Sequence, residues 1–471
     1  MDGNGEKMSY QDFIARKLDD WQPVGFKYDC AFDGLYPHQD ALVRWAIRLG
    51  RAAIFADTGL GKTRMQVEWA DVVSRYANGS ILILAPLAVA EQTVEESARI
   101  GIRVTHVRDD SDIDPSEGCG IFITNYERLH LFDTSEFVGV VLDESSIIKH
   151  HDAKTLQTLL DAFRDTPYRL CATATPAPND WTELGTHAEF LGICTRPEML
   201  SEYFVHDGGE TQVWRLKGHA RQAFWRWVSS WGAMIRSPAD LGFDATAYEL
   251  PPLVVNQVSV GTNAQAAEGM LFALEASSLS ERRQARKYSI TQRVAACAEQ
   301  VNATDGAWII WCELNAEADA LREAIPEAVE IRGSDPSHKK EKALHDFAHG
   351  DIRVLITKPK IAGFGLNWQH CRNVAFVGVT DSFESYYQAV RRCWRFGQTM
   401  PVNVWLYVSE LEGAVLANLQ RKERDALAMF EQLSAETKDA VRAAVLGSRR
   451  ESNEYNAAHR VRIPQFLEAA H

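Results

Sequence analysis

The segment A-D-T-G-L-G-K-T, residues Ala56–Thr63, constrains the fold of this chain more than any other part of its sequence. It directly follows the apolar run Ala52–Phe55 and precedes a stretch compatible with a helix. This order of strand, glycine-rich loop and helix is that of a P-loop, in which backbone N–H groups turn toward phosphate oxygens. We therefore predict an α/β domain with a phosphate-binding loop at the edge of its sheet.

Each part of the loop has an expected role in holding ATP. Gly59 and Gly61 let the backbone turn, Lys62 would reach the terminal phosphates, and the Thr63 hydroxyl would ligate Mg²⁺. The first position is Ala56 where glycine is usual. A dinucleotide site is excluded, because the third glycine of G-x-G-x-x-G is missing. The residues expected to contact the nucleotide here are Asp57, Thr58, Gly59, Leu60, Gly61, Lys62 and Thr63.

Short apolar runs alternate with polar, helix-compatible stretches in two separate parts of the chain. Such alternation is typical of a doubly wound parallel sheet. We therefore predict two α/β lobes of the same architecture. The expected strands are residues 52–55, 81–85, 121–124, 138–142 and 169–172 in the first series, and 308–311, 329–331, 354–357, 374–377 and 402–408 in the second.

The stretch between the two series has a different character, with an aromatic-rich part followed by an Ala/Glu/Arg/Gln-rich helical segment. We expect its tryptophans, Trp214, Trp225, Trp227 and Trp231, to be packing residues of a helical insertion; a base-stacking platform is the alternative. The boundary between the lobes is expected near Tyr248–Pro252. The predicted division is a leader at 1–34, lobe 1 with the ATP-binding motifs at 35–192, the helical insertion and connection at 193–300, lobe 2 at 301–445 and a tail at 446–471.

A pair of acidic residues ends one of the predicted strands of lobe 1. The run Val138–Leu142 is followed by D-E-S-S, Asp143 to Ser146, which places two carboxylates at the carboxyl edge of the sheet, where ligands bind in this architecture. About 80 residues beyond a P-loop, this pattern predicts a Walker B box. Asp143 would hold the Mg²⁺ shell, and Glu144 would orient and activate the attacking water.

Length and composition are those of a folded protein with more than one domain. The chain has 471 residues, of which 46% are apolar and 24% are charged, so a largely disordered or fibrous protein is not expected. Its longest apolar run, residues 81–90, is too short to span a bilayer, and no secretory signal is visible at the N-terminus. Eight cysteines without a C-x-x-C pair argue against a zinc finger or a disulfide framework. We expect a cytoplasmic protein without a membrane partner.

Several further motifs, in this order, resemble those of the superfamily-two helicases, specifically the Swi/Snf-like DNA translocases. The resemblance runs from about Leu35 to Val408. Besides the P-loop and the acidic box, it rests on L-Y-P-H-Q at 35–39, C-A-T-A-T-P-A-P-N at 171–179, W-T-E-L-G-T-H-A-E-F-L at 181–191, T-K-P-K-I-A-G-F-G-L-N-W at 357–368 and Q-A-V-R-R-C-W-R-F-G-Q at 388–398.

The resemblance implies two tandem RecA-like lobes that hydrolyse ATP between them. Gln39 would pair with adenine, while Gly365 and Asn367 would contribute from motif V. Arg392 and Arg395 would be arginine fingers delivered by lobe 2, and their spacing would place both on one face of a helix. The neighbouring arginine at 391 is expected to point elsewhere.

Some residues depart from the pattern of the nuclear remodellers in that family. The box is D-E-S-S where those enzymes usually have D-E-A-H, and Lys149 is followed by His150-His151-Asp152. This form is similar to helicases of phages and mobile elements, which implies phage or host DNA-processing proteins as possible partners. The adjacent histidines could suggest a metal site, but without a cysteine or glutamate partner we interpret them as surface residues.

The net charge of −14 weighs against a nucleic-acid partner unless charge is segregated along the chain. Two basic stretches offer such segregation, although each can also be an ordinary solvated helix face. They consist of Arg282, Arg283, Arg286, Lys287 and Arg293, and of Arg391, Arg392 and Arg395.

Three functions remain open at this point. The leading one is a translocase on duplex DNA; the second is a strand-separating DNA or RNA helicase of the same superfamily. The third is a non-enzymatic nucleotide-binding scaffold, which the presence of Lys62, Asp143 and Glu144 disfavours. A motor subunit that works with a separate nuclease or methyltransferase is compatible with the first two.

Overall fold

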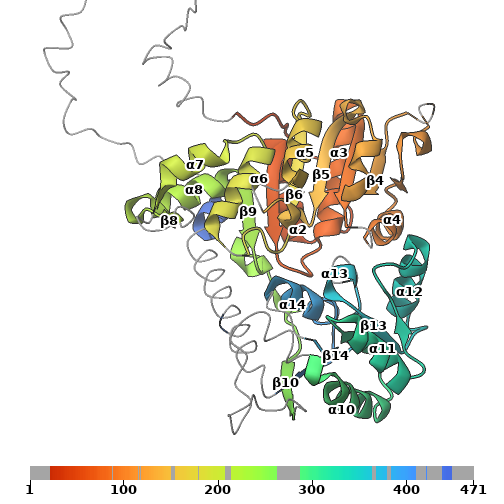
Figure 1. The fold of residues 1–471 in the computed structure, drawn as a ribbon. Helices are drawn as coiled ribbons and strands as arrows, with labels where there is room; N and C mark the ends of the chain where they lie inside the picture. Colours follow the sequence, from red (N-terminus) through yellow and green to blue (C-terminus); the bar gives the residue numbers. More distant parts are fainter. Residues whose placement is uncertain are drawn as a thin grey trace, which may run out of the picture.

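The computed structural model describes residues 22–86, 89–149 except 115 and 117, 154–206 except 179, 214–261, 287–362, 367–378, 383–409, 421 and 438–447. These residues form two α/β lobes stacked one on the other (Figure 1). The two predicted lobes, each with a parallel sheet, are thereby confirmed. Within the described residues, no helix is both long and apolar enough to cross a membrane.

Lobe 1 is built on a parallel sheet of seven strands in the order β3-β4-β2-β5-β6-β1-β9. The order places β5, β6 and β1 side by side, so the loops that follow them meet at one edge of the sheet. The strands are β1 (Arg51–Ala56), β2 (Ser80–Ala85), β3 (Val104–His106), β4 (Ile121–Asn125), β5 (Phe137–Asp143), β6 (Tyr168–Ala172) and β9 (Gly232–Ile235).

Helices cover both faces of this sheet, because successive side chains of each strand point to opposite faces and both sets are apolar. Ile54 packs in one buried cluster with helices α2 and α3, whereas Phe55 packs in a second cluster with α6 and α8. The helices of lobe 1 are α2 (Pro37–Leu49), α3 (Lys62–Ala77), α4 (Ala90–Arg99), α5 (Lys154–Ala162), α6 (Leu184–Phe190), α7 (Arg196–Tyr203) and α8 (Arg221–Trp231).

Lobe 2 repeats the design with a parallel sheet of six strands in the order β10-β15-β14-β11-β13-β12. Its strands are β10 (Leu253–Val260), β11 (Trp308–Trp311), β12 (Val329–Glu330), β13 (Val354–Thr357), β14 (Asn373–Phe376) and β15 (Val402–Ser409). Its helices are α10 (Ile290–Asn302), α11 (Asn315–Ala324), α12 (Ser337–His349), α13 (Pro359–Ala362) and α14 (Phe383–Val390).

All ten predicted strands are present, but the stretch predicted as a helical insertion at 193–300 contains two further sheet strands. β9 pairs with β1 and extends the sheet of lobe 1, while β10 pairs with β15 and belongs to lobe 2. Among the described residues of the stretch, the α-helices are α7, α8 and α10, and a short antiparallel pair, β7 (Phe204–His206) and β8 (Trp214–Leu216), stands between the first two of these. The change from one sheet to the other falls between residues 235 and 253, a span that includes Tyr248–Pro252.

The tryptophans of this stretch pack in the core, in line with the packing interpretation. Trp225 and Trp231 of α8 are 4% and 0% exposed, and Trp214 and Trp227 are partly buried against the same cluster. A base-stacking platform needs exposed ring faces, which the first two do not offer.

Both ends of the described chain pack against lobe 1, which differs from the predicted domain limits. Helical residues 438–446 return from lobe 2, and their Val441 and Val445 are buried in the core cluster of lobe 1. At the other end, residues of the predicted leader lie along α2, where Gly25 passes so close that an added Cβ would lie 2.0 Å from the backbone oxygen of Ile47. Lobe 1 therefore holds segments from both sides of its motifs, and the limit of lobe 2 at residue 445 is corrected.

One arginine of the first basic stretch is buried inside lobe 2 instead of facing solvent. Arg293 of α10 pairs with Glu317 of α11 at 2.7 Å, and their side chains are 1% and 0% exposed. The second oxygen of Glu317 accepts hydrogen bonds from the backbone N–H groups of Glu313 and Leu314. Arg282, Arg283 and Arg286 of the same stretch lie outside the described residues, as do His150, His151 and Asp152.

We predict that Glu317→Gln destabilises lobe 2 by about 3 kcal/mol, because the change removes the carboxylate that pairs with the buried guanidinium of Arg293. Urea denaturation followed by tryptophan fluorescence measures the effect, since Trp308 and Trp311 lie in the core of lobe 2. Glu323→Gln, at an exposed position of the same helix, is the matched control. Equal midpoints for the two variants would contradict a structural role for the pair.

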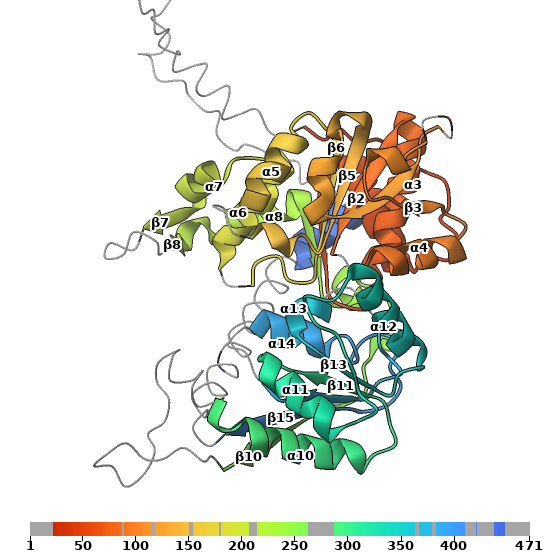
Figure 2. The same ribbon diagram turned by 45° about the vertical axis from the view of Figure 1, so that its right-hand side comes forward.

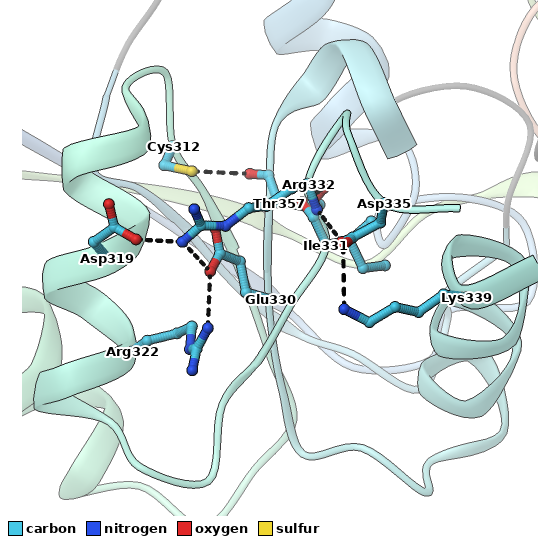
Figure 3. A network of polar contacts seen from close by, with 9 residues as sticks. All are labelled: Cys312, Asp319, Arg322, Glu330, Ile331, Arg332, Asp335, Lys339 and Thr357. Atoms are coloured by element: carbon cyan, nitrogen blue, oxygen red, sulfur yellow. Dashed lines mark hydrogen bonds and ion pairs between the residues drawn. The ribbon is translucent and has the colours of Figure 1, made fainter. Parts of the chain in front are cut away.

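A surface network of polar contacts joins β12, α11 and α12 at the carboxyl edge of the lobe 2 sheet (Figure 3). Arg332 contacts Glu330 at 2.7 Å and also pairs with Asp319, while its backbone N–H donates to Asp335. Next to it, the Thr357 hydroxyl donates to the backbone oxygen of Ile331 at 3.2 Å. The network thereby holds the start of α12 and the start of motif V at one edge of the sheet.

Candidate nucleotide site between the lobes

The P-loop has the geometry that the glycine pattern predicts. Gly59 and Gly61 have φ angles of 93° and 82°, in the left-handed region that favours glycine. Helix α3 begins directly after the loop at Lys62, so its free backbone N–H groups face the loop. The Lys62 ammonium donates a hydrogen bond to the backbone oxygen of Ala56 at 3.0 Å. The lysine thus lies across the loop where phosphates are expected.

The acidic pair follows β5 at the same sheet edge as the P-loop. Asp143 is 7% exposed, and its Oδ1 accepts a hydrogen bond from Nε2 of Gln66 at 2.6 Å. The backbone oxygen of Asp143 accepts from the Tyr126 hydroxyl at 2.7 Å. Gln66 is absent from the residues predicted from the sequence; it lies on α3, one turn beyond Lys62.

The charges of the site act on one another because they lie close together in a partly buried region. Burial lowers the pKa of Lys62, and the nearby carboxylates of Glu144, Asp57 and Asp143 oppose that shift. Burial also raises the pKa of Asp143, and the negative charge of Glu144 raises it further. A cation bound between the two acids would relieve this strain, because an opposite charge favours the ionised carboxylate.

Glu144 has an unusual backbone conformation for a residue with a side chain. Its φ and ψ angles are 50° and 52°, in the left-handed region that costs free energy outside glycine. Its Oε2 accepts a hydrogen bond from the Thr173 hydroxyl at 3.2 Å. Thr173 follows β6, which lies between β5 and β1, so the strand order explains why motif III reaches the acidic box.

A buried polar pair, Ser145 and His187, lies next to the acidic box. The Ser145 hydroxyl lies 3.2 Å from Nε2 of His187, and both residues are fully buried. Burial lowers the pKa of His187 to about 4, so the imidazole is neutral near pH 7. His187 lies in the segment 181–191 that carries part of the family resemblance, and this contact gives that segment a structural role.

Lobe 2 presents Arg392 and Arg395 to the acidic box. Arg392 is 3% exposed and interacts electrostatically with Glu144 and Asp143, while burial and Arg392 lower the pKa of Arg395 to about 9. The Nε atom of Arg395 has no hydrogen-bond partner among the described residues. An anion such as a phosphate would satisfy this buried nitrogen. The expected helix face is wrong, however, because α14 ends at Val390 and the arginines lie in the turns beyond it.

The neighbouring Arg391 does not point away from the site. It pairs with Oδ2 of Asp57 at 3.0 Å and donates to the backbone oxygen of Thr58 at 3.0 Å. The Tyr387 hydroxyl donates to the other oxygen of Asp57 at 2.9 Å. Lobe 2 therefore holds the P-loop directly through these two side chains, and the expectation for Arg391 is corrected. The turn after α14 carries arginines toward both the P-loop and the acidic box.

Gln39 lies over the P-loop, but both ends of its amide are engaged within the protein. Its Nε2 donates to the backbone oxygen of Leu60 at 3.0 Å, and its Oε1 accepts from the backbone N–H of Tyr36 at 3.1 Å. A bidentate contact with adenine would have to replace both bonds. Beside it, Tyr248 and Phe396 stack at 4.6 Å and contact Tyr36, which brings together aromatic rings from three parts of the chain.

The two motif V residues cannot both be placed at the nucleotide. Asn367 donates from Nδ2 to Glu96 of α4 at 3.1 Å, which is a contact between the lobes. Gly365 lies outside the described residues, as does Asn179 of motif III.

The donor atoms present fit the expected Mg²⁺. Mg²⁺ prefers oxygen ligands and is usually held by one or two carboxylates together with phosphates. Asp143 at the end of β5 and the Thr63 hydroxyl at the start of α3 supply oxygens of this kind. The electrostatic strain between Asp143 and Glu144 provides a further reason for a cation there.

Comparison with known proteins gives matches to both lobes. The family model of the SNF2-related domain matches residues 38–228, and that of the helicase conserved C-terminal domain matches residues 292–397. The bifunctional helicase and thymine dioxygenase JBP2 of Leishmania braziliensis is 28% identical over 94 residues, and that of Leishmania tarentolae is 27% identical over 94 residues. Each alignment covers 20% of this chain and 9% of the relative.

The matched family models agree in order and position with the two sheets. The first covers the P-loop, the acidic box and motif III on lobe 1, and the second covers motif V and the arginines on lobe 2. The lobes are therefore a tandem RecA-like pair, and the chain belongs to the superfamily-two helicases of the Swi/Snf-like type.

Proposed function

We propose that this protein hydrolyses ATP between its lobes and uses the cycle to translocate along duplex DNA. The observation that carries the proposal is that lobe 2 reaches the P-loop of lobe 1 through Arg391, which pairs with Asp57 at 3.0 Å, in the same turn as Arg392 and Arg395. The charge of Glu144 acts on both of these arginines. A nucleotide-binding scaffold would not need cations from one lobe at the acids of the other. Family membership supports the same class of activity.

The residues divide the chemistry among them. Lys62 and the N–H groups at the start of α3 would bind the phosphates, and Asp143 with Thr63 would hold Mg²⁺. When bound, Mg²⁺ neutralises charge on the phosphates. Glu144 would accept a proton from the attacking water, with its carboxylate oriented by the Thr173 hydroxyl.

The arginines would couple hydrolysis to motion. A cation delivered from lobe 2 stabilises charge that develops in the transition state, and it does so only while the lobes are closed. The γ-phosphate thus favours closure of the lobes, and loss of the γ-phosphate allows the lobes to open. Because Arg391 and Tyr387 already bind Asp57 in this structure, the closed arrangement also has protein contacts of its own.

One contact links the acidic box to a segment expected to hold nucleic acid. In the family that this chain resembles, Thr124, Asn125 and Tyr126 occupy positions that contact the nucleic-acid backbone. The Tyr126 hydroxyl donates to the backbone oxygen of Asp143, and burial raises the pKa of that hydroxyl well above its usual value. A shift of either group therefore acts on the other, which is a physical path from the bound strand to the Walker B acid.

Movement on duplex DNA and separation of its strands are distinguished by two substrates. A translocase displaces a third strand from a triplex but leaves a forked duplex paired, whereas a strand-separating helicase opens the fork. We expect ATP-dependent displacement from the triplex and no opening of a DNA or RNA fork. Opening of the fork at the same rate as triplex displacement would favour a strand-separating helicase.

We predict that binding to duplex DNA weakens steeply with salt, despite the acidic composition. A grip on phosphates gives a slope of log affinity against log salt of about −0.9 for each phosphate neutralised. Fluorescence anisotropy of a labelled duplex at several salt concentrations measures it, and we expect a slope steeper than about −2. Affinity independent of salt would contradict a phosphate-gripping surface.

A further inference from the structure

A second group of potential ligands, outside the P-loop and the acidic box, lies between the lobes. Helix α4 of lobe 1 and helix α12 of lobe 2 face each other across the gap between the lobes (Figure 2). The groove that they line has a cavity volume of about 370 Å³. Its side chains include Glu91, Glu95 and Glu96 of α4, and Glu341, His345 and His349 of α12.

Three of these side chains form a compact donor set. The ligand atoms of Glu95, His345 and His349 all lie within 4.8 Å of one another. His345 and His349 are four residues apart on α12, so both lie on one face of the helix, and their rings stack with centroids 4.0 Å apart. Nε2 of His345 lies 3.5 Å from Oε1 of Glu95. The three donors therefore lie close together in the groove.

One of the two imidazoles, that of His349, has an acceptor at Nδ1, which leaves its other nitrogen for a metal. Nδ1 of His349 lies 2.9 Å from the backbone oxygen of His345, the geometry of an N–H donor to a carbonyl. Nδ1 of His345 lies 3.9 Å from Oδ1 of Asp346, which is beyond hydrogen-bond distance. Metal-bound histidines usually donate their second N–H to a carbonyl or carboxylate in this way, which fixes the tautomer that ligates.

We propose that Glu95, His345 and His349 form a transition-metal site, of the kind that takes Zn²⁺, which joins the two lobes. Two imidazole nitrogens and one carboxylate are a ligand set found for Zn²⁺, with water in the fourth position. Mg²⁺ and Ca²⁺ prefer oxygen ligands alone and fit this set poorly. The side chains of Glu95 and His345 are 43% and 47% exposed, so they have the freedom to draw in to bonding distance.

The position of the donors gives the site a regulatory consequence. Glu95 belongs to lobe 1 and both histidines belong to lobe 2, so the metal binds more tightly when the lobes are together. It stabilises that arrangement by the difference between its binding free energies in the closed and open states. Opening of the lobes is needed in each cycle of the proposed motor. The metal would therefore act as a brake, a consequence that rests on the proposed function, whereas the binding site itself does not.

Binding is tested by titrating Co²⁺ as a spectroscopic probe, and Zn²⁺ in competition, into the full-length protein with Mg²⁺ present. We expect one site with His and Glu ligands, and a loss in affinity on the order of tenfold or more for Glu95→Gln and for His349→Gln. The matched controls are Glu91→Gln, which lines the same groove, and His338→Gln, at an exposed position of the same helix. Both should bind as the unchanged protein does.

Each other outcome of the titration contradicts part of the proposal. Unchanged affinity in Glu95→Gln and His349→Gln would refute the site. Loss in His349→Gln alone would show a metal held by lobe 2, which refutes the bridge between the lobes. Folding of each variant is checked by its thermal melting curve, so that loss of metal is not confused with loss of structure.

The brake is tested by steady-state ATP turnover on duplex DNA with and without Zn²⁺. We expect Zn²⁺ to slow the unchanged protein and Glu91→Gln, but not Glu95→Gln. Inhibition that persists in Glu95→Gln would place the effect of Zn²⁺ elsewhere and refute the brake. If the protein shows no turnover at all, the proposed function fails, while the Co²⁺ titration still decides the site.

Discussion

Glu144→Gln is expected to abolish ATP turnover while leaving ATP binding close to normal. The change preserves the size of the side chain and a hydrogen-bond acceptor for Thr173, but it removes the group that would accept a proton from water. General base catalysis of this kind contributes about 10²–10⁴-fold to the rate. Phosphate release and equilibrium binding of a fluorescent ATP analogue, measured on the same preparation, separate the two effects.

Lys62→Ala should fail in the other way and serves as the comparison. The lysine is the one P-loop side chain expected to contact the terminal phosphates, so its loss should weaken ATP binding as well as turnover. Its ammonium now bonds only to the Ala56 oxygen in the described contacts, a bond that phosphate would replace. Normal turnover in purified Glu144→Gln would refute the Walker B assignment, whatever the lysine variant does.

Arg392→Ala and Arg395→Ala are expected to reduce turnover far more than nucleotide affinity. Arginine fingers contribute on the order of 10³–10⁵ to the rate of phosphoryl transfer, because they act on charge that develops in the transition state. ATP affinity, stimulated turnover and triplex displacement should be compared for each variant. Near-normal turnover in either would show that the register of the motif is wrong.

The control for this experiment follows from the structure. Arg391 contacts Asp57 and Thr58 of the P-loop, so Arg391→Ala is expected to disturb the interface between the lobes and is not a neutral change. Arg372 of lobe 2 is exposed, which makes Arg372→Ala the better control. If Arg372→Ala lost turnover as fully as the finger variants, the loss would reflect general damage to lobe 2.

The strands and the P-loop could be predicted from the sequence because local signals specify them. Buried parallel strands are continuous apolar runs, and a loop such as Gly59–Lys62 between a strand and a helix has few alternatives. β9 and β10 were not predicted, because they lack this local signal. β9 is four residues long, and β10 alternates exposed and partly buried side chains along an edge, so neither forms a long apolar run.

The roles of individual side chains in the site depended on tertiary contacts that local patterns do not contain. Spacing alone put Arg392 and Arg395 on one helix face and Arg391 off it, but the helix ends at Val390 and the turn sends all three into the cleft. Gln66 carries no motif signal of its own, and only the position of α3 beside β5 brings it to Asp143. The same holds for His187 beneath Ser145, which joins segments 42 residues apart.

The proposed metal ligands between the lobes could not be predicted from local sequence patterns either. His345 and His349 have helical spacing, but Glu95 is distant in the sequence and belongs to the other lobe. His150 and His151 are adjacent in the sequence and therefore suggest a metal site at first sight. The histidines that lie beside a carboxylate are instead His345 and His349, one turn apart on α12. The donor set exists because α4 and α12 line the same groove between the lobes.

The most direct test of the proposed motor is the rate of ATP hydrolysis by the purified protein with duplex DNA, single-stranded DNA or RNA, with Glu144→Gln as the blank. Hydrolysis should be slow without nucleic acid, and duplex DNA should stimulate it more than either single strand, because the proposed cleft grips a duplex across both lobes. Stimulation by single strands or RNA but not by duplex DNA would contradict translocation on the duplex. Turnover no faster than the Glu144→Gln blank under every condition would contradict the motor itself.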